Sequence, residues 1–172
     1  MVYSSELSTV EFAPFYKPYI DKSGELELIE SLKLSSQKAI DFFKTVPAEK
    51  HEFSYASNKW TIKEILLHLI DAERIFAYRA LRFARNDKTP VLGFEENDYV
   101  PESYANTRSL EDLLEEYKKQ RESTLALLSS FSDEVLKRVG VANGSEISVR
   151  AIGFIIVGHE THHLGIIKER YL

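Results

Sequence analysis

The 172-residue sequence contains no cysteine. No disulfide, thiolate nucleophile or cysteine-ligated metal can therefore form, and any metal must be bound by histidine, aspartate or glutamate. The absence is compatible with a reducing compartment, because extracellular domains often depend on disulfides. A cytoplasmic location is therefore expected.

The sequence also lacks the features of nucleotide-binding, nucleic-acid-binding and membrane-spanning proteins. Its seven glycines are scattered singly and form neither of the glycine-rich patterns that cradle phosphates. A net charge of −5 does not supply the basic surface that phosphate contacts require. The longest apolar run, residues 151–158, is too short to span a bilayer, and the first residues lack the pattern of a secretory signal. We expect neither a nucleic-acid partner nor a membrane span.

Composition and periodicity predict a single all-α domain over residues 1–172. Hydrophobic residues make up 44% and charged residues 28% of the chain, as in a compact domain with a sizeable core. Four segments combine apolar residues at helical spacing with helix start or stop signals. They run from Ser23 to about Val46, from Thr61 to about Asn86, from Ser109 to about Ser130, and from Ser148 onward. Four such helices predict an up-down four-helix bundle.

Two other segments bear on function. Residues 86–108 are polar, contain two prolines and one glycine, and are longer than a normal connection, so we expect a lid or a wall of a site. The aromatic segment FAPFYKPYI, residues 12–20, precedes the first helix and is expected to be extended and exposed.

The sequence GHETHHLG at residues 158–165 places three histidines and a glutamate on the last helix. At about 100° per residue, His159 and His163 project from the same apolar face as Ile156. Two imidazoles one turn apart, separated by about 6 Å along the axis, can bind one cation. His162 lies at the flank of this face and is expected to support a ligand or to line the pocket.

The same stretch also matches the H-E-x-x-H pattern of zinc proteases as His159, Glu160 and His163. Those enzymes take a third ligand downstream, but the corresponding positions hold Ile166 and Glu169. A third ligand is therefore expected from upstream, and the protease is the least favoured function. Glu160 would be the catalytic base of a protease, but it is turned about 80° from the histidine face. We expect it to tune a ligand or to pair with a neighbouring Lys or Arg.

His68 is the best upstream candidate, because it shares one face of the second helix with Ala72 and Arg79. One histidine from this helix and two from the last could meet inside the bundle and leave coordination positions open for water or substrate. A hydrogen-bonded core histidine is the alternative for His68. Arg79 is expected to form an ion pair with another helix. Trp60 is expected at the core edge or in the pocket wall.

Three segments of the chain resemble the DinB/YfiT superfamily, in particular its DinB-like subgroup with a late GHxxHH motif. They are KWTIKEILLHLIDAERIFAYRALRFAR at 59–85, GFEENDYV at 93–100 and NGSEISVRAIGFIIVGHETHHLGIIKERYL at 143–172. The resemblance implies a four-helix bundle with a three-histidine site for a divalent metal such as nickel or zinc. Carried over onto this sequence, the ligands are His68, His159 and His163.

The resemblance leaves the reaction open, because it covers thiol-dependent S-transferases, isomerases and metal-dependent hydrolases. We expect an enzyme whose metal activates water or a thiol for hydrolysis or S-transfer on a small-molecule substrate. An S-transferase would also need a low-molecular-weight thiol as cofactor. The alternative is a non-catalytic metal-binding module for stress response or dimerisation. A homodimer is expected from the resemblance and from the exposed aromatic segment 12–20.

Overall fold

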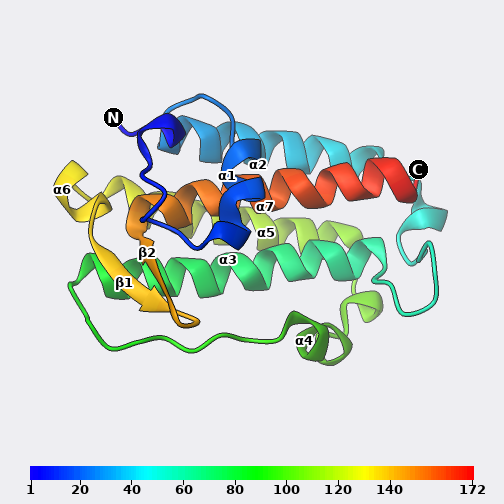
Figure 1. Ribbon diagram of the computed structural model, residues 1–172. Helices are drawn as coiled ribbons and strands as arrows, with labels where there is room; N and C mark the ends of the chain where they lie inside the picture. The colour runs from blue at the N-terminus through cyan, green and yellow to red at the C-terminus, as the bar shows by residue number, and fades with distance from the viewer.

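Four long helices form the body of the protein in the computed structural model, which describes all 172 residues (Figure 1). They are α2 (Leu28–Thr45), α3 (Ile62–Ala84), α5 (Leu110–Ser129) and α7 (Val149–Arg170). The all-α four-helix bundle predicted from the sequence is confirmed. None of the helices combines the length and the apolar character that crossing a membrane requires.

Short elements connect and cover the long helices. They are α1 (Lys17–Lys22), α4 (Glu96–Glu102), α6 (Asp133–Leu136), the strands β1 (Val139–Ala142) and β2 (Ser145–Ser148), and 3-10 helices at Ser4–Glu6, Pro14–Tyr16, Ala48–Lys50 and Ala105–Thr107. The strands form an antiparallel hairpin around the predicted turn at Asn143 and Gly144, whose φ angles are 49° and 75°. Positive φ at both central residues is typical of two-residue hairpin turns.

Capping residues set the starts of the long helices. The Thr61 hydroxyl accepts a hydrogen bond from the Glu64 N–H, and the Glu64 carboxylate accepts one from the Thr61 N–H, so the predicted capping box is present. The serines expected to start α5 and α7 also cap them. Only α2 starts later than predicted. Glu27 caps it, whereas the Ser23 hydroxyl donates to the carbonyl of Ile20 at the end of α1.

The helices follow one another around the bundle in the order α2, α5, α3, α7. Both α2 and α3 pack against α5 and α7, so α2 and α3 lie on a diagonal. Helices α3 and α5 run in the same direction, opposite to α2 and α7 (Figure 1), so the two consecutive long helices α3 and α5 do not alternate as the predicted up-down connectivity requires. Asn106 ties the starts of the two parallel helices together through hydrogen bonds with Thr61 and Glu64 of 2.8 and 3.0 Å. The connection formed by residues 86–108 is long because α3 and α5 are parallel. The chain must therefore run back along the bundle from the end of α3 to the start of α5.

The first part of helix α7 is enclosed on all sides. Helices α1, α2 and α3 all pack on it, and every residue from Val149 to Gly158 is buried. This enclosure explains why residues 151–158 form a continuous apolar run rather than a stripe, since a helix covered on all sides is apolar on all sides.

The aromatic segment 12–20 folds onto α7 as a 3-10 helix followed by α1, so the expectation that it is extended was wrong. Phe12 and Ile20 are buried, and of the four aromatic residues in this segment only Phe15 is exposed, at 56%. The aromatic residues therefore mostly cover the core of their own chain. The homodimer stays a prediction and has lost this part of its support.

Gly158 permits the close approach of α1 to α7. A Cβ at this position would lie 1.8 Å from the carbonyl oxygen of Tyr19, far inside van der Waals contact. Because the clashing atom belongs to the backbone of α1, it cannot move away by a side-chain rotation. The glycine of the GHxxHH motif is therefore required for packing.

We predict that Gly158→Ala lowers the free energy of unfolding by about 1–3 kcal/mol, because the added methyl group forces α1 away from α7. Gly165→Ala on the same helix is the control, since no atom lies within 4 Å of its Cβ position. Alanine at an exposed helical position should stabilise the protein by up to about 1 kcal/mol. Urea denaturation of both variants measures the difference. Equal stability of the two variants would contradict the proposed packing role.

Candidate metal centre

His68 from α3 and His159 and His163 from α7 bring their rings together between the two helices. The Nε2 atom of His159 lies 3.1 Å from Nε2 of His68 and 3.0 Å from Nε2 of His163. The three potential ligand atoms all lie within 4.8 Å of one another. The structure thus brings together the three histidines that the sequence pattern selects.

Hydrogen bonds among the three rings cannot satisfy both short contacts. Each Nε2 carries either one hydrogen or one lone pair, so the Nε2 of His159 can complete only one of its two contacts. Two nitrogens that each lie about 2.0–2.1 Å from one metal ion are themselves about 3 Å apart. The donor type and the spacing therefore fit a divalent metal better than a hydrogen-bonded core cluster.

Burial holds these histidines in the neutral form that binds metals. Desolvation lowers the pKa of His68 to about 4. Desolvation, with a smaller contribution from neighbouring imidazoles, lowers the pKa of His163 to about 3 and that of His159 well below its usual range. At neutral pH, no proton has to leave before the three nitrogens can act as ligands.

The three rings line a pocket of about 320 Å³. Its walls come from the segment 12–20, α3, the segment 86–108, the hairpin turn and α7. Six aromatic side chains dominate the lining: Phe15, Tyr16, Tyr19, Trp60, Phe76 and Phe94. The prediction that residues 86–108 form a wall of the site is confirmed, since Gly93, Phe94 and Glu96 lie in the lining.

Trp60 and His162 lie directly against the histidine cluster. The centre of the Trp60 ring is 4.7 Å from that of His68 and 6.3 Å from that of His163. Trp60 therefore belongs to the pocket wall, one of its two expected positions. The His162 ring lies 5.3 Å from the His163 ring and 5.5 Å from the Tyr19 ring, and it is not one of the three converging histidines.

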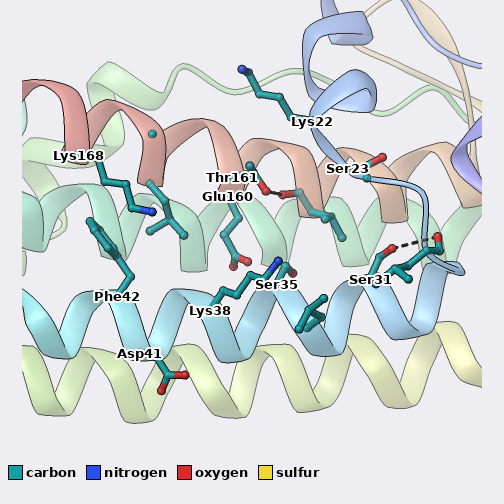
Figure 2. A pocket seen from close by; sticks show the side chains of 16 residues that line it. Lys22, Ser23, Ser31, Ser35, Lys38, Asp41, Phe42, Glu160, Thr161 and Lys168 are labelled. Carbon is teal, nitrogen blue, oxygen red and sulfur yellow. Dashed lines mark hydrogen bonds between the residues drawn. The ribbon is translucent and has the colours of Figure 1, made fainter.

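Glu160 faces away from this pocket. Figure 2 shows its side chain directed from α7 toward α2. The carboxylate accepts hydrogen bonds from Arg121, at 2.9 Å, and from the Tyr117 hydroxyl, and its side chain is only 2% exposed. The expected pairing of Glu160 with a basic residue is therefore present. Because the carboxylate is held on the far side of α7, the geometry argues against a general base at this position.

A larger hollow of about 700 Å³ lies between α2 and α7, and Glu160 contributes to its lining (Figure 2). Lys22, Lys38 and Lys168 border it, but no histidine does. Size alone would select this hollow, whereas the chemistry of the ligand atoms selects the smaller pocket. The candidate site is therefore the pocket at the three histidines.

Arg79 differs from its expected role. The predicted ion pair with another helix is absent, and the guanidinium instead donates from Nη2 to the carbonyl oxygen of Leu92, at 3.1 Å. Its Nε atom is buried without a hydrogen-bond partner. The guanidinium carbon lies 5.8 Å from the centre of the Phe76 ring, and the residue lines the pocket. Arg79 thus anchors the segment 86–108 without a counter-charge.

Tyr16, Tyr19 and Glu96 are among the pocket residues that the sequence did not single out. Desolvation raises the pKa of both tyrosines, so their hydroxyl groups stay protonated at neutral pH. The density of aromatic residues in segment 12–20 was the available signal. No local pattern shows that this segment folds across α7, because that contact depends on residues more than a hundred positions away.

The chain belongs to the DinB superfamily, whose family model matches residues 31–167. No curated protein matches the sequence. Among solved structures, it is similar to YfiT from Bacillus subtilis, with a TM-score of 0.74 and 19% identity over 83% of this chain and 82% of that one. YfiT is described as a probable metal-dependent hydrolase with an unusual four-helix bundle topology. At 19% identity, the similarity to YfiT shows that the two proteins share a fold, and it shows no more than that.

In the metal-free protein, we predict that acid weakens folding through the buried histidines. Because burial lowers the pKa of His68 from 6.5 to about 4, the unfolded state binds a proton below pH 6.5 that the folded state binds only near pH 4. The free energy of unfolding should therefore fall as the pH drops through this window, by about 3 kcal/mol from His68 alone.

Denaturant titrations of metal-free wild type and His68→Gln at pH 7 and pH 4.5 test this linkage. The loss of stability on acidification should be smaller in the variant, which lacks the titrating group. An equal loss in both proteins would show that the His68 imidazole does not resist protonation in the folded state.

Proposed function

We propose that this protein is a metal-dependent enzyme that acts on a small molecule, with a divalent metal held by His68, His159 and His163. The observation that carries the proposal is the convergence of three neutral imidazole nitrogens in the wall of a pocket. Membership of the DinB superfamily and the likeness to a probable metal-dependent hydrolase support it. Imidazole ligands suit both nickel and zinc.

The metal, when bound, lowers the pKa of a nucleophile and polarises the bond under attack. Two long helices supply the ligands, so packing of the bundle fixes the relative positions of the three rings. With three protein ligands, a metal held here would keep coordination positions open for water or substrate. The aromatic walls exclude water and provide an apolar surface for the body of a substrate.

Glu96 is the group that we assign to proton transfer. It is the only carboxylate in the pocket lining, and it forms no ion pair or side-chain hydrogen bond with the protein. A carboxylate within reach of the nucleophile can accept its proton and later return it to the leaving group. In this assignment, Glu96 takes the role that a zinc-protease pattern would give to Glu160.

The size of the pocket favours hydrolysis over S-transfer. A volume of about 320 Å³ is near the lower end for ligand pockets, which range from about 300 to 1,000 Å³. A hydrolase has to hold one small organic molecule and a water. An S-transferase would have to hold a thiol cofactor as well, because the chain has no cysteine of its own. A non-catalytic module would not need a pocket beside the metal.

We predict that the purified protein holds one divalent metal per chain and that alanine at any of the three ligands removes it. Each variant leaves two imidazoles, which bind a cation far more weakly than three. Elemental analysis of His68→Ala, His159→Ala and His163→Ala measures the loss. His162→Ala is the control, because His162 lies beside the cluster but is not one of the three, and it should keep its metal. Full metal content in His68→Ala would refute the three-ligand site.

We further predict metal-dependent turnover of small esters or amides. The metal-loaded protein is assayed with such substrates, and in parallel with an electrophile plus a low-molecular-weight thiol. Glu96→Gln should keep its metal but lower kcat by about 10²-fold or more, because the proton acceptor is removed. Glu102→Gln, an exposed change at the other end of α4, is the matched control. Activity in the thiol assay alone would replace hydrolysis by S-transfer, and inactivity in both assays would reject an enzyme acting on these substrates.

A further inference from the structure

Arg79 is the only one of three buried arginines that has no carboxylate partner. Arg121, which is 2% exposed, forms an ion pair with Glu73, and Arg150, which is 8% exposed, forms one with Glu11. Arg79 is 3% exposed, donates to the backbone carbonyl of Leu92 and lies beside the neutral Tyr16 hydroxyl, with no carboxylate partner. A buried charge without a counter-charge is costly, and natural proteins rarely keep one without a use for it.

The remaining contacts of Arg79 do not neutralise it. The carbonyl of Leu92, the Tyr16 hydroxyl and the face of the Phe76 ring supply partial charges only, and the Nε atom of Arg79 has no partner. The side chain lines the pocket that contains the histidine cluster. A divalent metal in the same pocket would add further positive charge, so the need for an anion would increase on metal binding.

One aromatic ring separates the guanidinium from the histidines. The guanidinium carbon of Arg79 lies 5.8 Å from the centre of the Phe76 ring, and that ring lies 6.3 Å from the ring of His159. A molecule that lies along Phe76 therefore has one end at Arg79 and the other at the histidine cluster. A small organic molecule is long enough to reach from the Arg79 guanidinium to the histidine rings.

We propose that the pocket binds a small organic acid, whose carboxylate pairs with Arg79 and whose apolar body lies along Phe76. The inference rests on the proposed function, since it places the reacting end of the acid at the three histidines. Arg79 is the only lysine or arginine in the pocket lining, so the metal-free pocket offers one fixed positive charge, which matches a carboxylate rather than a phosphate dianion. Arginine binds carboxylates through a planar array of donors.

Glu96 is the competing partner inside the protein, because its carboxylate lines the same pocket. The structure contains no ion pair between Glu96 and Arg79, although both side chains border one cavity. If Glu96 moved onto Arg79, it would block the binding of an external acid. Glu96→Gln removes this competitor and should leave acid binding unchanged or tighter.

Binding to the metal-free protein tests the proposal, because a carboxylate could otherwise bind the metal itself. Ligand-detected NMR gives the dissociation constants of phenylacetate, the neutral analogue phenylacetamide and inorganic phosphate. Wild type should bind the acid about tenfold or more tightly than the amide, as expected for a charged hydrogen bond. Arg79→Gln should remove this preference, and Arg79→Lys, which keeps the charge, should retain part of it. Arg85→Gln, the same charge change at an exposed position of the chain, should retain all of it.

The comparison of acid with amide in wild type decides the proposal even if Arg79→Gln does not fold. No preference for the acid in wild type, or an undiminished preference in a folded Arg79→Gln, would overturn it. Tighter binding of phosphate than of phenylacetate would overturn the assignment of a carboxylate. Failure of the metal site leaves this comparison intact, because it uses metal-free protein, and loss of acid binding leaves the predicted metal content untouched.

Discussion

All four long helices meet at one guanidinium group, that of Arg121. From α5 it forms an ion pair with Glu73 on α3 and another with Glu160 on α7, and it donates to the Leu32 carbonyl and the Ser35 hydroxyl on α2. The group is buried, so the electrostatic interactions are strong and the loss of one partner would leave a charge uncompensated, at a cost of about 3–5 kcal/mol. This interaction fixes how the helices are rotated relative to one another, which nonpolar packing alone specifies less tightly.

The rotation of α7 determines where the histidines point. Glu160 and His159 are adjacent in sequence and about 100° apart on the helix. Because Arg121 holds Glu160 on one side of α7, His159 is directed toward α3, where His68 lies. Gly158, one residue earlier, lets α1 cover a further side of the helix. Gly158, His159 and Glu160, three consecutive residues of the GHxxHH motif, thus contribute to helix packing, to the proposed metal site and to helix orientation, in that order.

The features that the sequence predicts are those that local interactions determine. The capping box at Thr61, the turn at Asn143 and the spacing of His159 and His163 each involve residues at most a few positions apart. The start of α2, the helical fold of residues 12–20 and the partners of Arg79 were missed. The fold of residues 12–20 and the partner of Arg79 depend on contacts between different segments of the chain, which neither periodicity nor capping reveals. The start of α2 was misplaced because Ser23 bonds to the end of α1, whereas Glu27, which is not one of the usual capping residues, caps the helix. His68 could be predicted as a ligand because helical periodicity alone places it on the same face of α3 as Ala72 and Arg79.

The charge of the pocket connects the metal centre with Arg79. The three histidines are neutral, so they would leave the full charge of a divalent metal uncompensated, and Arg79 adds a further positive charge. Glu96 is the only negative group in the lining. With metal bound, the pocket is therefore electropositive and surrounded by aromatic side chains of low polarity, which strengthens its attraction for anions. The positive charge of Arg79 and a bound metal would also favour the deprotonated form of a nucleophile in the pocket. The same charges would therefore bind an acidic ligand and promote nucleophilic attack on it.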